Sequence, residues 1–272
     1  MPLAYRDGHT IHYEEVGDRS ALPLLLIMGL GLSSRAWETL PSRLSAHFRV
    51  LLFDNRGTGR SGRKGWMYRM RDLADDAVNV LDAAQVAQAD VFGISMGGMI
   101  AQELAIRHPY RVRRLALGAT FASWVRGHKP ALSTVLDLIL LVLQRQRVAP
   151  ERLGRLLLSS EFQASNPRRA LDWMIRSGHA EVRCAAAQVG AILGHAALHR
   201  LEQIRAPTLV ITGDSDRLVP PRNSEVLAAA IPDARLLVLR GAGHVFPLER
   251  EEETVRALTE HFLGANRTSA AG

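Results

Sequence analysis

The chain has 272 residues, of which 47% are hydrophobic and 22% charged; these values exclude a disordered or fibrous protein and fit a globular one. Its single cysteine, Cys184, excludes an intrachain disulfide framework and fits a reducing, cytoplasmic compartment. The formal net charge is +7 and most of the basic residues are arginine, which together with the high alanine content suggests a GC-rich bacterial genome. The N-terminus has no signal-peptide pattern, and the longest apolar runs are too short for a membrane span.

Short apolar segments recur along the chain and alternate with amphipathic ones. The segments 3–5 and 10–16 flank Asp7-Gly8, a hairpin turn signal that predicts an antiparallel edge pair. The other strand-like runs are continuously apolar, which is typical of strands buried on both faces; they cover 22–28, 48–53, 89–94, 112–117, 208–212 and 234–239. Helical patterns are expected between them, at 37–46, 70–84, 96–108, 222–230 and 248–263, with Gly264 as the final stop. This alternation predicts an α/β fold with a doubly wound, mostly parallel sheet.

The interval 121–205 breaks this rhythm because it contains no convincing strand. Helices are expected there at 132–145, 150–160, 167–177 and 181–198. We therefore predict a helical cap at 121–205, inserted into a core of residues 1–120 and 206–265, with 266–272 as a flexible tail. The segment 135–143 is apolar apart from Asp137, which indicates a helix buried on more than one side. It could cover a pocket, pack against a second copy or touch a membrane surface, and pocket cover is favoured because ligands bind at the carboxyl edge of such sheets.

The stretch Gly93-Ile94-Ser95-Met96-Gly97 connects an expected strand to an expected helix. It matches G-x-S-x-G, the nucleophile elbow, in which a tight corner exposes the serine hydroxyl. Glycine is needed on both sides of the serine because a Cβ there would collide across the corner. The strand–turn–helix context favours a nucleophile elbow with Ser95 as the nucleophile over a Gly-rich turn that has only a structural role.

A serine hydroxyl needs a base, and the base needs an acid that orients it. His244 stands on a Gly-rich loop after the last expected strand, and the order serine, acid, histidine is the one this motif requires. Five other histidines lie in edge strands, helix ends or the last helix, where surface and capping roles are common: His9, His12, His47, His108 and His261. Asp214 and Asp216 both follow the strand at 208–212, and spacing alone does not choose between them.

A second oxyanion donor is expected in the loop after the first long apolar strand. Met28-Gly29-Leu30-Gly31 stands there, and its glycines allow the backbone to approach the serine closely. The backbone N–H groups of Leu30 and Met96 are therefore the predicted oxyanion hole.

At this point the residues resemble the α/β-hydrolase superfamily, in the branch with a helical cap, from residue 22 to 262. The stretch 54–61 resembles the family pattern D-x-R-G-x-G-x-S. The stretch 213–220 resembles its acid loop, G-x-x-D-x-x-V-P, and this resemblance assigns the acid to Asp216.

One feature of the chain departs from many members of that family. Met28-Gly29 replaces the common His-Gly before the oxyanion loop, which is similar to aclacinomycin methylesterase-like and 3-oxoadipate enol-lactonase-like proteins. Haloalkane dehalogenases and epoxide hydrolases of this fold use an aspartate nucleophile, so Ser95 argues against both.

The residues and the resemblance together predict a serine hydrolase that cleaves a carboxylic ester or lactone through an acyl-enzyme, without a metal or other cofactor. Carbon–carbon bond hydrolysis and cofactor-free perhydrolysis use the same triad and stay open, as does a non-catalytic ligand-binding protein of this fold. A small, largely apolar substrate is expected, because methionine-rich walls adapt to irregular apolar groups. The pocket candidates, each with core packing as its alternative, are Met28, Met99, Trp124, Leu138 and Val245.

An arginine-rich stretch and a pair of histidines are not expected to form a nucleic-acid site or a metal site. The arginine-rich stretch 56–71 has no nucleic-acid recognition motif, so no nucleic-acid partner is expected. His195 and His199 are four residues apart but lack the glutamate of H-E-x-x-H, which favours polar contacts of the cap over a metal site. The chain is expected to be a monomer or a homodimer.

Overall fold

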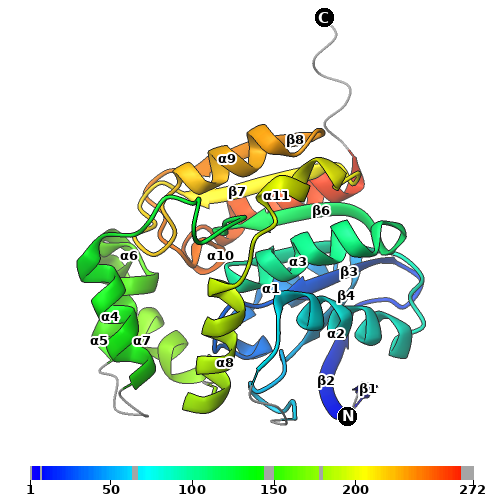
Figure 1. The fold of residues 1–272 in the computed structure, drawn as a ribbon, viewed down its shortest axis with the longest axis horizontal. Coiled ribbons are helices and arrows are strands. Elements are labelled where there is room, and N and C mark those ends of the chain that lie inside the picture. Colours follow the sequence, from blue (N-terminus) through cyan, green and yellow to red (C-terminus); the bar gives the residue numbers. More distant parts are fainter. Residues whose placement is uncertain (1, 7, 63–66, 144–149, 178–179, 265–272) are drawn as a thin grey trace, which may run out of the picture.

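The protein, seen in a computed structural model, is described at residues 2–6, 8–62, 67–143, 150–177 and 180–264 (Figure 1). Its strands are β1 (Leu3–Arg6), β2 (His9–Val16), β3 (Leu22–Ile27), β4 (Phe48–Phe53), β5 (Ala89–Ile94), β6 (Val112–Gly118), β7 (Thr208–Gly213) and β8 (Ala234–Leu239). They form one sheet in the order β1-β2-β4-β3-β5-β6-β7-β8. The pairs β1/β2 and β2/β4 are antiparallel and the others are parallel, which confirms the mostly parallel α/β sheet.

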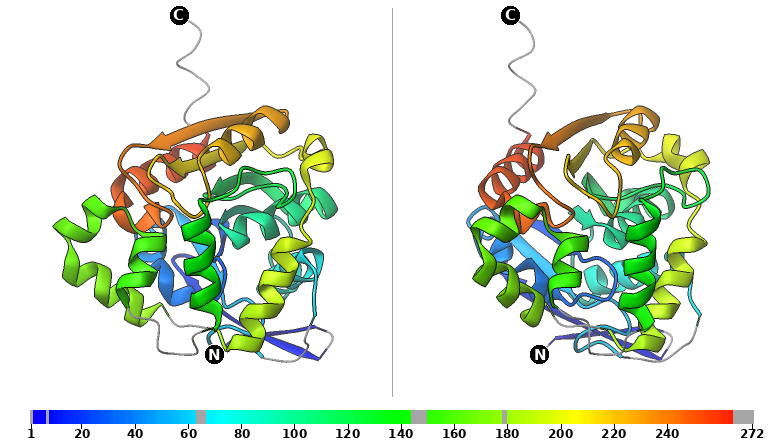
Figure 2. Two further views of the ribbon diagram at one scale, coloured as in Figure 1. Left: turned by 60° about the vertical axis from the view of Figure 1, so that its left-hand side comes forward. Right: turned by 90° about the vertical axis from the view of Figure 1, so that its left-hand side faces the viewer.

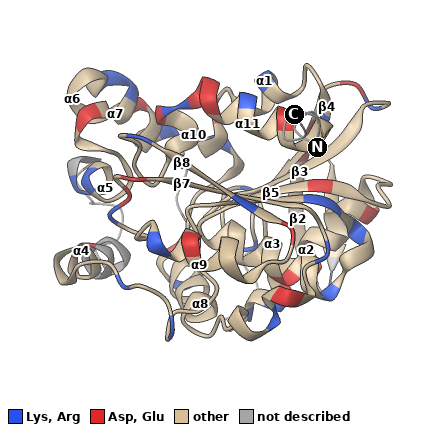
Figure 3. Cartoon of the chain, turned by 90° about the horizontal axis from the view of Figure 1, so that it is seen from above, with Lys and Arg blue, Asp and Glu red and all other residues tan. Residues whose placement is uncertain are grey.

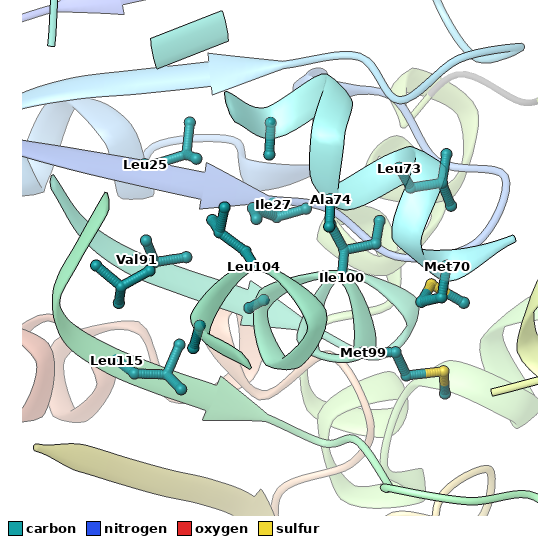
Figure 4. Packing of buried hydrophobic residues seen from close by; sticks show 14 of the residues in the cluster. Leu25, Ile27, Met70, Leu73, Ala74, Val91, Met99, Ile100, Leu104 and Leu115 are labelled. Carbon is teal, nitrogen blue, oxygen red and sulfur yellow. The ribbon is translucent and has the colours of Figure 1, made fainter. Parts of the chain in front are cut away.

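Helices cover both faces of this sheet. They are α1 (Leu40–Leu44), α2 (Met70–Ala83), α3 (Met96–Arg107), α9 (Arg222–Ala230), α10 (Phe246–Glu249) and α11 (Glu251–Leu263), with the 3-10 turns η1 (Ser34–Trp37), η2 (Pro109–Arg111) and η3 (Leu198–Gln203). Successive strand residues point to opposite faces, so Leu25 and Leu26 belong to two different hydrophobic clusters. Figure 4 shows Ile100 and Leu104 of α3 in the cluster that contains Leu25.

The chain between β6 and β7 is helical. It contains α4 (Leu132–Leu143), α5 (Pro150–Leu157), α6 (Ser160–Ser165), α7 (Pro167–Arg176) and α8 (Val182–Leu193). Helices α4 to α7 lie beyond one end of the sheet, and two further views show the same arrangement (Figures 1 and 2). The indole N–H of Trp173 on α7 donates to the Ala36 carbonyl in η1 over 2.9 Å, which attaches these helices to the core. We call residues 121–205 the cap.

Several of the expected helices are divided in the structure. The helix predicted at 37–46 is replaced by η1 and the short α1, because Glu38 has a positive φ of 48° that no helix can accommodate. The helix predicted at 248–263 breaks at Arg250, whose φ and ψ are −126° and 53°, so α10 and α11 are separate. Gly264 ends α11 with a φ of 80°, as expected of a helix stop.

The cap helices are also shorter than their patterns indicated. The helix predicted at 150–160 ends at Leu157 as α5, and a separate helix, α6, begins at Ser160, where the Ser159 side chain caps it by accepting the Phe162 N–H. The pattern at 181–198 ends early, with α8 finishing at Leu193.

Burial of one apolar segment was predicted wrongly. Strand β8 lies at the edge of the sheet, and Leu236 and Val238 are 38% and 43% exposed, so it is not buried on both faces. Edge position is a tertiary property, which is why an apolar run by itself did not reveal it. In α4, Leu136 is 52% exposed and the side chains of 138–143 lie outside the described residues, so burial of this helix on more than one side stays a prediction.

Charged residues of both signs are interspersed around the rim of the molecule (Figure 3). In the arginine-rich stretch, the Arg56 guanidinium is buried against Asp76, with two N–O distances of 2.6 Å. Arg60 pairs with Glu14 and Asp54, whereas Arg63, Lys64 and Trp66 lie outside the described residues. Across the described ranges, no helix combines the length and apolarity that a bilayer crossing needs.

Candidate active site

Ser95 occupies a strained corner between β5 and α3. Its φ and ψ are 58° and −123°, a conformation that costs free energy for any residue with a side chain. A Cβ on Gly93 would overlap the carbonyl of Gly97, and a Cβ on Gly97 would overlap the carbonyl of Ile27. The two glycines are therefore sterically required for the corner that the sequence motif predicted.

The backbone of Ser95 is held from both sides. Its N–H donates to the Gly118 carbonyl over 2.8 Å, and its carbonyl accepts the Thr120 hydroxyl at 2.7 Å. Helix α3 then packs on the sheet through Met99, Ile100 and other apolar side chains (Figure 4). The Ser95 side chain itself is half-buried, and no protein group within the described ranges hydrogen-bonds its hydroxyl.

A buried acid–base pair lies on two other loops at the carboxyl ends of parallel strands. Asp216 follows β7 and His244 follows β8, and the two side chains are 5% and 4% exposed. One carboxylate oxygen of Asp216 lies 2.8 Å from His244 Nδ1. Its other oxygen accepts the N–H groups of Leu218 and Val219 at 2.8 and 2.9 Å. The carboxylate is therefore fixed by the backbone and can orient the imidazole.

The other candidate acid has a different position. Asp214 is exposed, and its carboxylate accepts the Gly241 N–H at 2.7 Å. It therefore shapes the turn that precedes His244, whereas Asp216 contacts the imidazole directly.

The loop after β3 passes beside Ser95. A Cβ on Gly29 would lie 3.1 Å from Ser95 Cβ and 3.5 Å from its Oγ, so a side chain at this position would crowd the serine. Leu30 follows directly, and Met96 is the first residue of α3, where helix N–H groups have no intrahelical acceptor. Both predicted oxyanion donors thus belong to backbone that adjoins the Ser95 side chain.

The pocket candidates are distributed over different environments. Met28 and Val245 are buried in one hydrophobic cluster and Met99 in the other, so each contributes to core packing. Trp124 is partly buried, with the Lys129 ammonium 4.9 Å from its ring centre. The side chain of Leu138 lies outside the described residues. A pocket built by these residues stays a prediction.

Two polar residues that the sequence analysis did not associate with the site contact its loops. Glu249, the last residue of α10, accepts the Gly243 N–H through its carboxylate at 3.1 Å, next to His244. Burial raises the pKa of this carboxyl. Gln188, on α8, accepts the Gly31 N–H at 2.8 Å, next to Leu30. A glutamate five residues after His244 could have been noticed, but no local signal marks Gln188.

In the described ranges, no three His, Cys, Asp or Glu residues are arranged to hold a metal ion. His195 is buried and its Nε2 lies 3.3 Å from the Gln102 amide oxygen, whereas His199 is exposed. Burial lowers the pKa of His195 to about 4. His195 therefore makes a buried polar contact, whereas His199 lies at the surface.

Comparisons with known proteins identify the fold family of the chain. Residues 23–251 match the family model described as alpha/beta hydrolase fold. Rhodomycin D methylesterase DauP from Streptomyces sp. (strain C5) is 32% identical, over 96% of this chain and 97% of its own. Poly(3-hydroxyalkanoate) depolymerase from Ectopseudomonas oleovorans is 31% identical, over 91% of this chain and 86% of its own.

A solved structure is similar over nearly the same span. The enol-lactonase from Burkholderia xenovorans LB400 superposes with a TM-score of 0.87 at 27% identity, covering 96% of this chain and all of that one. The family match covers most of the chain, and both curated relatives exceed 30% identity over nine-tenths of it. The chain therefore belongs to the α/β-hydrolase fold family, as a carboxylic ester hydrolase.

Proposed function

We propose that the chain hydrolyses a carboxylic ester or lactone through an acyl-enzyme formed on Ser95. The observation that carries this proposal is the 2.8 Å contact between Asp216 and His244, on loops at the same sheet edge as the strained corner of Ser95. A strained, half-buried serine at the same sheet edge as a buried imidazole–carboxylate pair has the components that acyl transfer needs. The methylesterase and enol-lactonase relatives support the same substrate class.

In this mechanism His244 transfers the proton, and Asp216 orients the His244 imidazole. His244 Nε2 removes the hydroxyl proton while Ser95 Oγ attacks the substrate carbonyl carbon. The carbonyl π electrons move to oxygen, which the N–H groups of Leu30 and Met96 stabilise, each by about 3 kcal/mol. Collapse of this intermediate breaks the bond to the alkoxy oxygen, and His244 returns the proton to that leaving group. Water then repeats the sequence on the acyl-enzyme and releases the acid.

Substrate binding completes this arrangement. In the proposed mechanism, the Ser95 hydroxyl donates a hydrogen bond to His244 Nε2 when the substrate is bound. Catalytic hydrogen bonds commonly tighten in this way between the free enzyme and the complex. A small, largely apolar substrate fits the proposal, since Leu30 is apolar, partly buried and follows Gly29 beside Ser95.

The test combines a fluorophosphonate probe with a substrate panel. The probe should label the wild-type protein at Ser95, and Ser95→Ala should abolish labelling and lower turnover of a p-nitrophenyl ester by about 10⁴- to 10⁶-fold. Turnover retained by Ser95→Ala would exclude the serine mechanism. A substrate panel separates ester hydrolysis from the other reactions of the same triad. It contains esters, lactones, a diketone whose hydrolysis breaks a carbon–carbon bond, and an ester with added peroxide.

A further inference from the structure

Gln188 connects the cap to two loops of the core through both ends of its amide. Its side chain is completely buried, at 0% exposure, on helix α8. Its Oε1 accepts the Gly31 N–H at 2.8 Å, and its Nε2 donates to the Arg56 carbonyl at 3.2 Å. Both ends of a buried amide must be satisfied, and here each end is used on a different loop.

The Arg56 end of this connection is a rigid anchor. The Arg56 guanidinium forms two bonds to the Asp76 carboxylate, both 2.6 Å long and both buried. The Tyr68 hydroxyl lies beside the same carbonyl and donates to the Cys184 carbonyl, one turn before Gln188 on α8. The contacts at the Arg56 end therefore fix the position of the Gln188 amide independently of its hydrogen bond to Gly31.

The Gly31 end, in contrast, is held by hydrogen bonds from the cap and not by packing. Gly31 has a φ of 70°, and a Cβ there would meet no atom within 4 Å, so neither a side chain nor close packing holds it. Its restraints come from the cap: its N–H donates to Gln188 and its carbonyl accepts the Ala180 N–H at 2.8 Å. Ser33, two residues on, donates from both its N–H and its hydroxyl to the Ser177 carbonyl. The loop that contains Leu30 is held from the cap side.

We propose that Gln188 is a positioning residue that holds Leu30 in the geometry needed for its N–H to bind the oxyanion. This inference rests on the proposed function, since it concerns the same oxyanion hole. The amide fixes the peptide plane that follows Leu30, and that plane limits rotation of the Leu30 backbone. The cap thus takes part in building the catalytic geometry, in addition to covering the site.

The expected consequence is a loss in the chemical step with little change in substrate binding. Without the Gln188 amide the loop samples other conformations, and the Leu30 N–H occupies its position near the oxyanion for only part of the time. Since one oxyanion donor contributes about 10²- to 10³-fold to kcat, a misplaced donor should lower kcat by about 10- to 100-fold. KM should change less than about threefold, because the oxyanion exists only in the transition state and the intermediate.

Two variants of the full chain test this inference. Gln188→Met removes both hydrogen bonds and should lower kcat at every pH. Gln188→Glu accepts the Gly31 N–H when ionised but donates to the Arg56 carbonyl only when protonated. The ratio of variant to wild-type kcat should therefore rise as the pH is lowered from 8 to 6, and taking the ratio cancels the titration of the catalytic base. A role in packing alone gives no such rise.

The affinity for a boronic acid gives a second readout. A boronate bound to Ser95 imitates the tetrahedral intermediate, so its affinity should fall by about the same factor as kcat in Gln188→Met. Gln203→Met is the control, because Gln203 is an exposed glutamine of the cap, in η3. It should keep kcat within about twofold.

The possible outcomes separate this inference from the proposed function. If Ser95→Ala is inactive but both Gln188 variants keep wild-type kcat and boronate affinity, the positioning role is overturned and the serine mechanism stands. A rise in KM with unchanged kcat also overturns it, as does a pH-independent loss in Gln188→Glu. If Gln188→Met does not fold, the pH-dependent ratio of Gln188→Glu decides alone. If Ser95→Ala is active, the proposed function itself fails.

Discussion

The carboxylate of Glu249 binds Ser159 of the cap through both its oxygens. Oε1 accepts the Ser159 N–H at 2.9 Å and Oε2 accepts the Ser159 hydroxyl at 2.6 Å. Oε2 also accepts the Gly243 N–H, and the Val245 N–H donates to the Leu157 carbonyl, so the residues on both sides of His244 are tied to this junction. The histidine loop and the oxyanion loop are each attached to the cap, at different points.

Replacing Glu249 with glutamine should weaken this junction. Glutamine has only one acceptor oxygen, and its NH₂ group would take the place of the other carboxylate oxygen. At least one donor of Ser159 or Gly243 would then lose its acceptor. Leaving a buried donor unsatisfied costs about 1–3 kcal/mol, and urea denaturation of Glu249→Gln should show a loss in that range together with reduced kcat. The control is Glu252→Gln on α11, which is exposed. Equal stability of the two variants would contradict the role of Glu249.

A methyl group on Gly97 should be incompatible with the elbow. The added Cβ of Gly97→Ala would overlap the Ile27 carbonyl of β3, and backbone at the centre of the sheet cannot move away cheaply. We expect a loss of more than about 3 kcal/mol of unfolding free energy, or failure to fold. Gly190→Ala is the matched control, because Gly190 lies within α8 and a Cβ there meets no atom within 4 Å. That variant should gain about 0.5–1 kcal/mol from helix propensity, and similar thermal midpoints for both would refute the steric explanation.

Replacing each acid by its amide should distinguish Asp216 from Asp214. In Asp216→Asn, the Leu218 and Val219 N–H groups still require the amide oxygen, so the NH₂ group faces His244 and favours the wrong tautomer. The expected fall in kcat is on the order of 10⁴-fold. Asp214→Asn keeps an acceptor for Gly241 and should change kcat by less than about tenfold. Measurement of both variants on one p-nitrophenyl ester suffices, and the reverse order of effects would transfer the acid role to Asp214.

Two buried histidines should make the fold sensitive to mild acid. Burial lowers the pKa of both His195 and His261 from 6.5 to about 4. Between these values the unfolded chain binds more protons than the folded one, so stability falls as the pH falls. The loss should be about 2 kcal/mol per histidine at pH 5 relative to pH 7.

Urea denaturation at these two pH values measures that slope. His261→Gln should be less sensitive to acid than the wild type, since an amide can still donate to the Leu115 carbonyl that His261 Nε2 contacts at 2.9 Å. His47→Gln, at an exposed position, should keep the wild-type slope. An unchanged slope in His261→Gln would show that this ring does not carry the effect. The burial of His261 also corrects the expectation that histidines of the last helix lie at the surface.

Local sequence signals were sufficient for much of the fold. Strands β4 and β8 span the residues that their apolar runs indicated, 48–53 and 234–239. Helix α9 likewise matches its predicted range. The breaks at Glu38 and Arg250 escaped prediction because each depends on backbone angles that packing imposes on an otherwise helical pattern. The exposure of β8 escaped it because an apolar strand has the same composition at the edge of a sheet as at its centre.

The sequence by itself determined the elbow and the order of the loops. Gly93 and Gly97 mark a corner that few other residues could form, and Asp216 and His244 follow their strands at positions where parallel strands end together. Spacing left Asp214 and Asp216 equivalent, and the family resemblance favoured Asp216; only the tertiary structure brought its carboxylate to the imidazole. Only the tertiary structure, too, placed Gln188 against Gly31, 157 residues apart in the chain. A contact of that range depends on how the cap packs on the core, and no local pattern of residues encodes that packing.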